Sequence, residues 1–171
     1  MCYSAKVWAD YRKYTKMFGA ELSIHEFINL FQRRSTDARV VIPKGMEMSF
    51  SLPLNEEERS IKALIDKFAT AEANRFEQDL FKQRTRLVEA ERKLLAKPTK
   101  AAVESQRIAT SKIERALEKL ANLRRTAPKD SDSRIYPGNY APVMVMEGGR
   151  RVIKPMRYQC RPAGKPSAYD V

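Results

Sequence analysis

A long amphipathic pattern occupies the middle of the chain, from Asn55 to Thr126. Apolar residues recur there at steps of three and four, which is the spacing of one face of an α-helix. Asn55 can cap a first helix that Pro98 ends, and Thr99 can cap a second helix that closes at Pro128. The pattern predicts an antiparallel helical hairpin of about 40 and about 25 residues. The apolar positions of the two helices are Ile61, Leu64, Ile65, Phe68, Phe76, Leu80, Phe81, Leu87, Val88, Leu94 and Leu95, then Val103, Ile108, Ile113, Leu117, Leu120 and Leu123.

The N-terminal part, residues 1–54, has shorter patterns and more aromatic residues. Ser23 and Glu26 have the spacing of a capping box, and apolar residues at helical spacing follow them. This predicts a short helix over residues 24–34. Beyond it, the stretch ARVVIPKGMEMSFSLP contains β-branched residues, two prolines and a glycine, which predicts a strand or an extended connection rather than a helix.

The C-terminal part, residues 127–171, begins with the polar linker PKDSDS. Alternating β-forming residues then surround a Gly-Gly turn, which predicts a β-hairpin of Val143–Glu147 against Arg150–Pro155. Neither flank alone has enough apolar residues for a core. The sequence therefore predicts an α+β fold in which residues 1–54 and 127–171 form one β domain and the helical hairpin, residues 55–126, interrupts it.

Composition narrows the class of function. The 171 residues include 33 Lys and Arg against 21 Asp and Glu, a net charge of +12. This excess favours a polyanionic partner such as nucleic acid, although a highly charged helix could produce the same excess by chance. Cys2 and Cys160 lie near opposite ends with no paired spacing, which favours the reducing cytoplasm. Charges interrupt every apolar run, so we expect a soluble protein with no signal peptide and no membrane partner.

Several catalytic patterns are missing from the sequence. There is no Gly-rich phosphate loop, no metal-ligand spacing and no Ser-His-Asp order, and His25 is the only histidine. A conventional zinc enzyme or catalytic triad is therefore not expected, and neither is a metal or cofactor. His25 falls on the predicted early helix, where an ordinary surface position is the simplest interpretation.

Cys2 offers a chemistry of its own because it directly follows Met1. Removal of the initiator methionine would leave a free amine and a thiol on one residue, with reference pKa values of about 8 and about 8.5. The amine can condense with an aldehyde to a Schiff base, and the thiol can then close on the same carbon to give a five-membered thiazolidine. Taken alone, a cysteine at this position is more often incidental.

Three short segments resemble, in order, those of the SOS-response-associated peptidase (SRAP) family. They are the initial MC, the segment RIYPGNYAPVMVM with its core Asn139-Tyr140-Ala141-Pro142, and KPMRYQCRPAG. In the family, an N-terminal M-C is followed by an N-x-A-P segment and then by an M-R-W-G-like segment. This chain has Tyr3 where glycine is usual and Tyr158 where tryptophan is usual, so it resembles a divergent branch that carries a helical insertion.

The resemblance implies a sensor of abasic sites in single-stranded DNA. The open-chain sugar of such a site exposes an aldehyde, which the N-terminal cysteine traps as a stable thiazolidine crosslink, and Cys2 is the matching residue. The family name also records a proposed peptidase activity on the chain's own N-terminus, where only Met1 precedes Cys2 here. The motif residues, together with basic and aromatic residues beside them, predict a DNA surface of Asn139, Pro142, Arg150, Arg151, Arg157, Tyr158 and Arg161.

The chain also departs from the family. There, the third segment is followed by an Asn-Ala-Arg motif and later by a glutamate and a histidine, and no residue here can be assigned to these. We therefore expect the N-terminal portion of a longer protein, a short natural form, or one half that needs a partner chain.

Other interpretations stay open at this point. The chain could be a non-catalytic module that binds nucleic acid or a protein, with the helical hairpin forming a partner or dimer contact, or a fragment that cannot close its core. The arginine-rich segment is equally compatible with a solvated basic hairpin. Cys160 is compatible with a small core residue.

Overall fold

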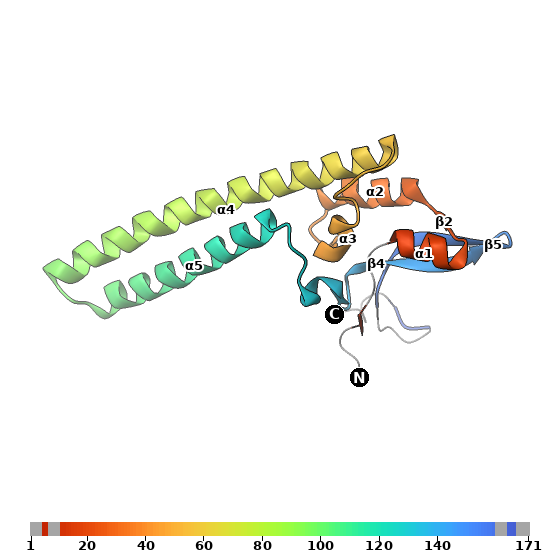
Figure 1. The fold of residues 1–171 in the computed structure, drawn as a ribbon. Helices are drawn as coiled ribbons and strands as arrows, with labels where there is room; N and C mark the ends of the chain where they lie inside the picture. The colour runs from red at the N-terminus through yellow and green to blue at the C-terminus, as the bar shows by residue number, and fades with distance from the viewer. Residues whose placement is uncertain (1–4, 7–10, 160–163, 167–171) are drawn as a thin grey trace. The chain divides into compact units, whose positions relative to one another are not determined.

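The structure, a computed structural model, is a mixed α+β fold with a long helical hairpin and small sheets, in agreement with the predicted class (Figure 1). It describes residues 5–6, 11–159 and 164–166. In that part of the chain the helices are α1 (Tyr11–Phe18), α2 (Ile24–Arg34), α3 (Lys44–Met48), α4 (Glu56–Ala96), α5 (Lys100–Arg124) and the 3-10 helix η1 (Asp130–Ser133). The strands are β1 (Ala5–Lys6), β2 (Glu21–Leu22), β3 (Arg134–Ile135), β4 (Tyr140–Glu147) and β5 (Arg150–Arg157).

The chain divides into two compact units. One is discontinuous and draws on residues 1–66 and 127–171, and we call it the core unit. The other contains residues 67–126, and we call it the hairpin unit. The boundary falls inside α4, so the first turns of this helix belong to the core unit. The two units are described separately below.

Helices α4 and α5 have the predicted lengths and caps. They contain 41 and 25 residues and run antiparallel (Figure 1). The side-chain oxygen of Asn55 accepts a hydrogen bond from the Glu58 N–H at 2.8 Å, and that of Thr99 accepts one from the Ala102 N–H at 3.2 Å. These bonds satisfy amide groups that have no partner inside the first turn of a helix. The predicted helical hairpin is thus confirmed.

Small side chains form the seam of the hairpin unit. Ala102, Ala109 and Ala116 of α5 are buried at intervals of seven residues, and Gln83 and Ala90 of α4 are buried with the same interval. Seven residues make about two helical turns, so each set lies on one helix face. Leu120 of α5 is buried as well, but several other large apolar side chains are exposed. The predicted apolar stripe is therefore wrong for five exposed residues, which are Phe81, Val88, Leu95, Val103 and Leu117.

Polar contacts join the two helices beside the seam. The Arg86 Nε donates a hydrogen bond to the Ser105 hydroxyl at 2.9 Å, and Arg124 forms an ion pair with Glu77 at 2.5 Å. The Arg124–Glu77 pair is exposed, so we expect it to contribute less than about 1 kcal/mol. We therefore expect packing along the alanine seam to stabilise the hairpin unit more than this ion pair does.

In the core unit, β5 is the central strand of a three-stranded sheet. It pairs antiparallel with β4 and parallel with β2, while β1 and β3 form a separate antiparallel pair. The β4–β5 turn consists of Gly148 and Gly149, whose φ angles of 55° and 79° match a two-residue hairpin turn that most side chains disfavour. The predicted hairpin is confirmed, and its strands extend farther than predicted.

Helix α2 begins and ends at the predicted residues, but its predicted capping box is wrong. The side chain of Ser23 makes no capping hydrogen bond. Its N–H instead donates to the Ile153 carbonyl of β5 at 3.0 Å, and Glu26 forms an ion pair with Lys154 at 2.9 Å. The sheet therefore binds the two groups that a capping box would have joined.

The prediction of an extended connection after α2 is wrong in part. Val41 forms an isolated bridge with Asn139, but Lys44–Met48 is the short helix α3. Pro43 precedes this helix with φ at −63°, an angle that proline favours at the start of a helix. Tertiary packing explains the difference, because Met46 is 1% exposed in the core.

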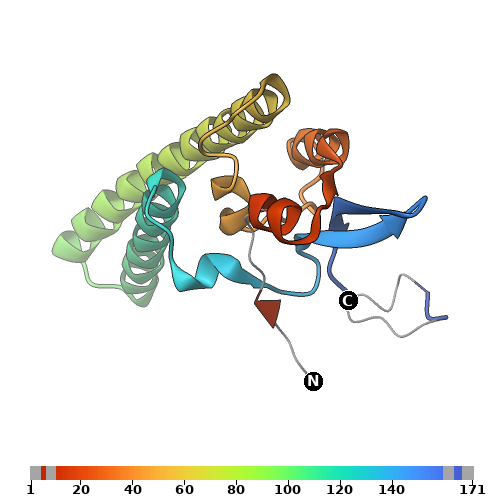
Figure 2. The same cartoon turned by 45° about the vertical axis from the view of Figure 1, so that its right-hand side comes forward.

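The core of this unit is built from helices as much as from strands. Tyr11 stacks on Phe50 with ring centroids 5.0 Å apart, and Phe31 meets Phe50 edge to face at 5.8 Å. Helices α1 and α2 both contact β5, which contributes Ile153 to the same cluster (Figure 2). Two turns of α4 add Ile61 and Ile65. A β domain alone is therefore too narrow a description of the core unit.

Candidate functional site

Strand β1, which follows Cys2 by three residues, pairs with the segment that carries the second family-like motif. Ala5 lies opposite Ile135 and Lys6 opposite Arg134. Directly after β3 the chain turns, and the Asn139 side-chain oxygen accepts a hydrogen bond from the Tyr136 N–H at 3.3 Å. Strand β1 and the second segment are therefore neighbours in the fold, although more than a hundred residues separate them in the sequence.

The third segment joins the same place through backbone hydrogen bonds. The Tyr158 N–H donates to the Asn139 carbonyl at 2.7 Å, and the Gly138 N–H donates to the Tyr158 carbonyl at 2.8 Å. Gly138 has a φ of 94°, a backbone angle suited to glycine, and this turn aligns the two segments. We call the region formed by β1, residues 134–139 and Tyr158 the junction. It brings together strand β1 and described residues of the second and third segments that carry the resemblance, while Met1 and Cys2 lie outside the described residues.

The predicted site residues other than Arg150, Arg151 and Arg157 fall into three groups. Cys2 and Arg161 lie outside the described residues. Asn139 and Tyr158 meet in the junction, whereas Pro142 is buried in β4 opposite Pro155. Asn139 and Pro142 thus have structural roles in the described part of the chain, the first in a turn and the second in the sheet.

The predicted arginines do not form one cluster. Arg157 lies opposite Tyr140, next to the junction, while Arg150 lies at the Gly-Gly turn at the other end of β5. Seven residues of strand separate them, a distance of roughly 23 Å. Arg150 forms an ion pair with Glu21 at 3.3 Å, and Arg151 donates to the Phe18 carbonyl at 2.7 Å. Of the three, Arg157 is therefore the one placed to act with the junction.

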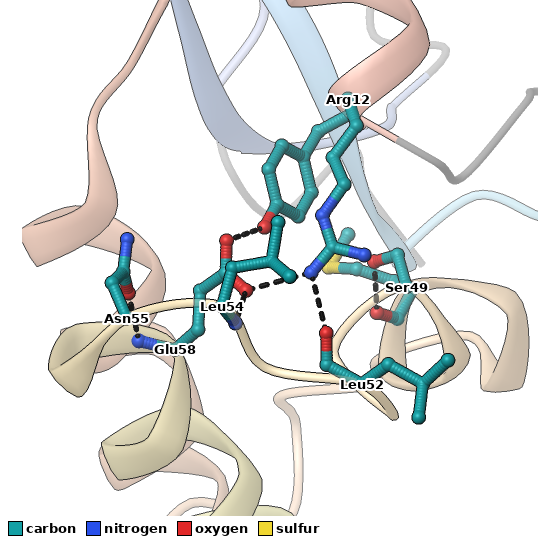
Figure 3. A network of polar contacts seen from close by, with 8 residues as sticks. Arg12, Ser49, Leu52, Leu54, Asn55 and Glu58 are labelled. Atoms are coloured by element: carbon teal, nitrogen blue, oxygen red, sulfur yellow. Dashed lines mark hydrogen bonds and ion pairs between the residues drawn. The ribbon is translucent and has the colours of Figure 1, made fainter.

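A buried polar network around Glu58 was not predicted by the sequence analysis (Figure 3). Glu58 is 5% exposed, and one of its oxygens accepts a hydrogen bond from the Tyr11 hydroxyl. The other oxygen accepts from the Arg12 guanidinium at 2.6 Å and from the Leu54 N–H at 2.8 Å. Arg12 also donates to the Leu52 carbonyl at 2.9 Å. The network joins α1 to the first turn of α4.

The network shifts the pKa values of its members in opposite directions. Burial raises the pKa of the Tyr11 hydroxyl, and its hydrogen bond to Glu58 raises it further. Burial also opposes ionisation of Glu58, but the hydrogen bonds from Tyr11, Leu54 and Arg12 outweigh it and lower the pKa of the carboxyl. Glu58 is therefore a stable anion at neutral pH and a poor general base. We assign it a structural role.

This pKa shift predicts an acid-dependent loss of stability. Because the pKa of Glu58 is lowered on folding, its contribution is fully present above its unfolded value of about 4.3 and is lost as the pH falls through the folded value. We expect the urea concentration at half unfolding of the wild type to decrease when the pH is lowered below about 4. The Glu58→Gln variant, measured at the same pH values, should show a smaller drop. An identical drop in both proteins would contradict this assignment.

The described residues contain neither a candidate metal site nor a candidate membrane-spanning helix. No group of three or more His, Cys, Asp or Glu side chains is arranged to hold a metal ion in that part of the chain. Among the described helices, none combines the length and the apolar character needed to cross a membrane. Comparisons with protein-family models, curated proteins and solved structures give no match to this chain.

Proposed function

We propose that this chain binds single-stranded DNA and traps the aldehyde of an abasic site through Cys2, as the resemblance to the SRAP family implies. One observation carries the proposal. Strand β1, which begins three residues after Cys2, meets described residues of the second and third segments in the junction. Such a meeting is expected if the segments form one site, and it is not required of unrelated parts of the chain.

The chemistry needs only the N-terminal residue and the aldehyde. The Cys2 amine attacks the aldehyde carbon, a C–N bond forms, and one water molecule leaves to give the imine. The thiol then adds to the same carbon, a C–S bond forms, and the thiol proton passes to the nitrogen. The reaction loses one water molecule overall and uses no oxidant or reductant. An amine of pKa about 8 is partly uncharged at neutral pH, as the first step requires.

The surface of the junction supports contact with a DNA strand. Tyr136 is 50% exposed and offers a ring on which a base can stack. Arg134 and Arg157 are exposed in the same region and can contact phosphates. The sequence analysis did not single out Tyr136 or Arg134, because their place beside β1 depends on a long-range strand pair. The net charge of +12 would increase the rate of encounter with DNA.

The experiment is a crosslinking assay with the purified chain. Mass spectrometry first establishes that Met1 is absent, and the chain is then mixed with single-stranded DNA that carries one abasic site. We expect a heat-stable shifted band on a denaturing gel. The same oligonucleotide after borohydride reduction has an alcohol in place of the aldehyde and should give no band. A folded chain without Met1 that gives no band with the unreduced DNA would refute the proposal.

The exposed apolar residues of the hairpin unit favour a second candidate function. Phe81 is 73% and Leu95 is 88% exposed, and both lie on α4. A non-catalytic module that uses α4 to bind a protein or a second copy of itself would expose such residues. This candidate predicts no covalent product with abasic DNA. It also predicts that Phe81→Ser and Leu95→Ser change the association state measured by analytical ultracentrifugation.

A further inference from the structure

A second place in the core unit has the chemistry of a nucleotide-binding site. A cleft of about 490 Å³ lies between α1, α3, the loop after α3 and residues 128–133. This volume is within the usual range for small-molecule sites. Lys13 and Lys129 are exposed basic residues that line it, and Met48 and Leu52 give it apolar surface. The cleft contains none of the residues that the sequence analysis assigned to DNA.

The residues that line the cleft carry more positive than negative charge. The guanidinium of Arg12 is balanced by Glu58, with which it forms an ion pair at 2.6 Å. Asp132 is the acidic residue among those lining the cleft, and its carboxylate accepts a hydrogen bond from the Lys129 backbone N–H at 2.7 Å. This hydrogen bond holds the Asp132 carboxylate at the start of η1. The basic side chains of Arg12, Lys13 and Lys129 therefore outnumber the acidic side chains of Asp132 and of Glu58, the partner of Arg12.

The cleft is also connected to the strand that follows Cys2. Lys6 in β1 forms an ion pair at 2.5 Å with Asp130 of η1, and η1 supplies part of the cleft wall. Strand β1, which begins three residues after Cys2, is therefore attached to that wall. The exposed fraction of Leu52 is 75%, so its side chain is open to contact by a base.

We propose that this cleft binds a nucleotide of the single-stranded DNA next to the abasic site. Lys13 and Lys129 contact its phosphate groups, and Met48 and Leu52 contact its base. The identity of the strand rests on the proposed function, but the cleft can be tested without crosslinking. Removal of a phosphate contact should change the salt dependence of DNA binding, because phosphate contacts release counterions. Removal of an apolar contact to a base should weaken binding without changing its salt dependence.

The test measures binding of an undamaged single-stranded oligonucleotide by fluorescence anisotropy over a series of salt concentrations. The double variant Lys13→Ala, Lys129→Ala should bind on the order of tenfold more weakly at low salt. Its slope of log K against log salt should be shallower by about 1.4, since each phosphate contact on a single strand contributes about 0.7. Leu52→Ala should bind more weakly with the slope unchanged.

A matched control removes the same charge elsewhere. Lys16 and Lys67 are exposed and do not line the cleft, so Lys16→Ala with Lys67→Ala should leave the slope nearly at the wild-type value. Equal losses of DNA affinity and of salt dependence in the two double variants would contradict the proposal that the cleft binds DNA. Competition by inorganic phosphate at the same concentration of phosphate groups would also overturn it, because that result would show a site for small anions.

The failure of this proposal is distinguishable from that of the proposed function. If the wild type gives no crosslink but the cleft variants lose binding as described, the Cys2 chemistry fails and the cleft stands. If the wild type crosslinks and the cleft variants bind like the control, the cleft fails and the Cys2 chemistry stands. Circular dichroism of each variant shows whether it remains folded.

Discussion

Replacing Cys2 with serine is expected to abolish the heat-stable product with abasic DNA. The N-terminal amine of the Cys2→Ser variant could still form an imine, but imines hydrolyse on heating, and a serine hydroxyl is a much weaker nucleophile than a thiol for closing the ring. Cys160→Ser is the matched control, because it removes the only other thiol of the chain. We expect that variant to give the same product as the wild type on the denaturing gel.

Chemical reduction separates the two steps of the reaction. Cyanoborohydride reduces an imine much faster than an aldehyde at neutral pH. Added during the incubation, it converts the imine to a stable amine, so it should restore a heat-stable band in the Cys2→Ser variant. Restoration would show that DNA still reaches the N-terminus and that only ring closure is lost. A heat-stable band from Cys2→Ser without cyanoborohydride would contradict a thiazolidine. Loss of the band in Cys160→Ser as well would also contradict the assignment to Cys2.

Replacing Glu58 with alanine is expected to destabilise the core unit by about 3–5 kcal/mol. Glu58 is 5% exposed and accepts hydrogen bonds from Tyr11, Arg12 and the Leu54 N–H. Its removal leaves these donors without their acceptor, and loss of one partner from a buried ion pair commonly costs this much. The urea concentration at half unfolding, followed by circular dichroism, should fall sharply.

The neighbouring glutamate provides the control. Glu57 is exposed on the same turn of α4 and carries the same charge near the same helix end. Glu57→Ala should therefore change stability by about 0.5 kcal/mol or less. Glu58→Gln should fall between the two, because it keeps an acceptor but loses the charge. Equal midpoints for Glu57→Ala and Glu58→Ala would show that the network contributes little.

The parts of the fold that the sequence predicted are those with local signals. Asn55, Thr99 and Pro98 mark the ends of α4 and α5, and Gly148 with Gly149 marks the β4–β5 turn. Each of these signals acts within a few residues, so it survives whatever packs around it. Exposure along the hairpin was not predictable in this way. It depends on an alanine seam whose partner helix must be known before the buried face can be chosen.

The parts that were missed depend on contacts between distant residues. Strands β1 and β3 have two residues each, too few for a pattern, and β2 exists because it pairs with β5. Glu58 gave no signal of its own, since three consecutive glutamates at a helix start are explained by the helix dipole alone. The structural role of Glu58 can be recognised only from its contacts with Tyr11 and Arg12, which come from a distant part of the sequence.

The sequence predicted which residues belong to the candidate site better than it predicted where they lie relative to one another. Asn139 and Tyr158 were singled out and do meet in the junction. Arg150 and Arg151 were grouped with them because they are close in sequence, but an extended strand of eight residues carries its two ends far apart. Pro142 belongs to the motif itself but is buried in the sheet, as is its neighbour Ala141, so alternation along the strand does not explain its burial.

The discontinuity of the core unit bears on the order of folding. Strand β2 must find β5 across the whole hairpin unit, which would be a slow search for a flexible connection. Helices form within about a microsecond, and an antiparallel pair brings the two ends of residues 67–126 close together before that search begins. The entropy of loop closure would then depend little on the number of residues inserted. Evolution could thus lengthen or shorten both arms by matched blocks of seven residues, preserving the alanine seam, without slowing the assembly of the core.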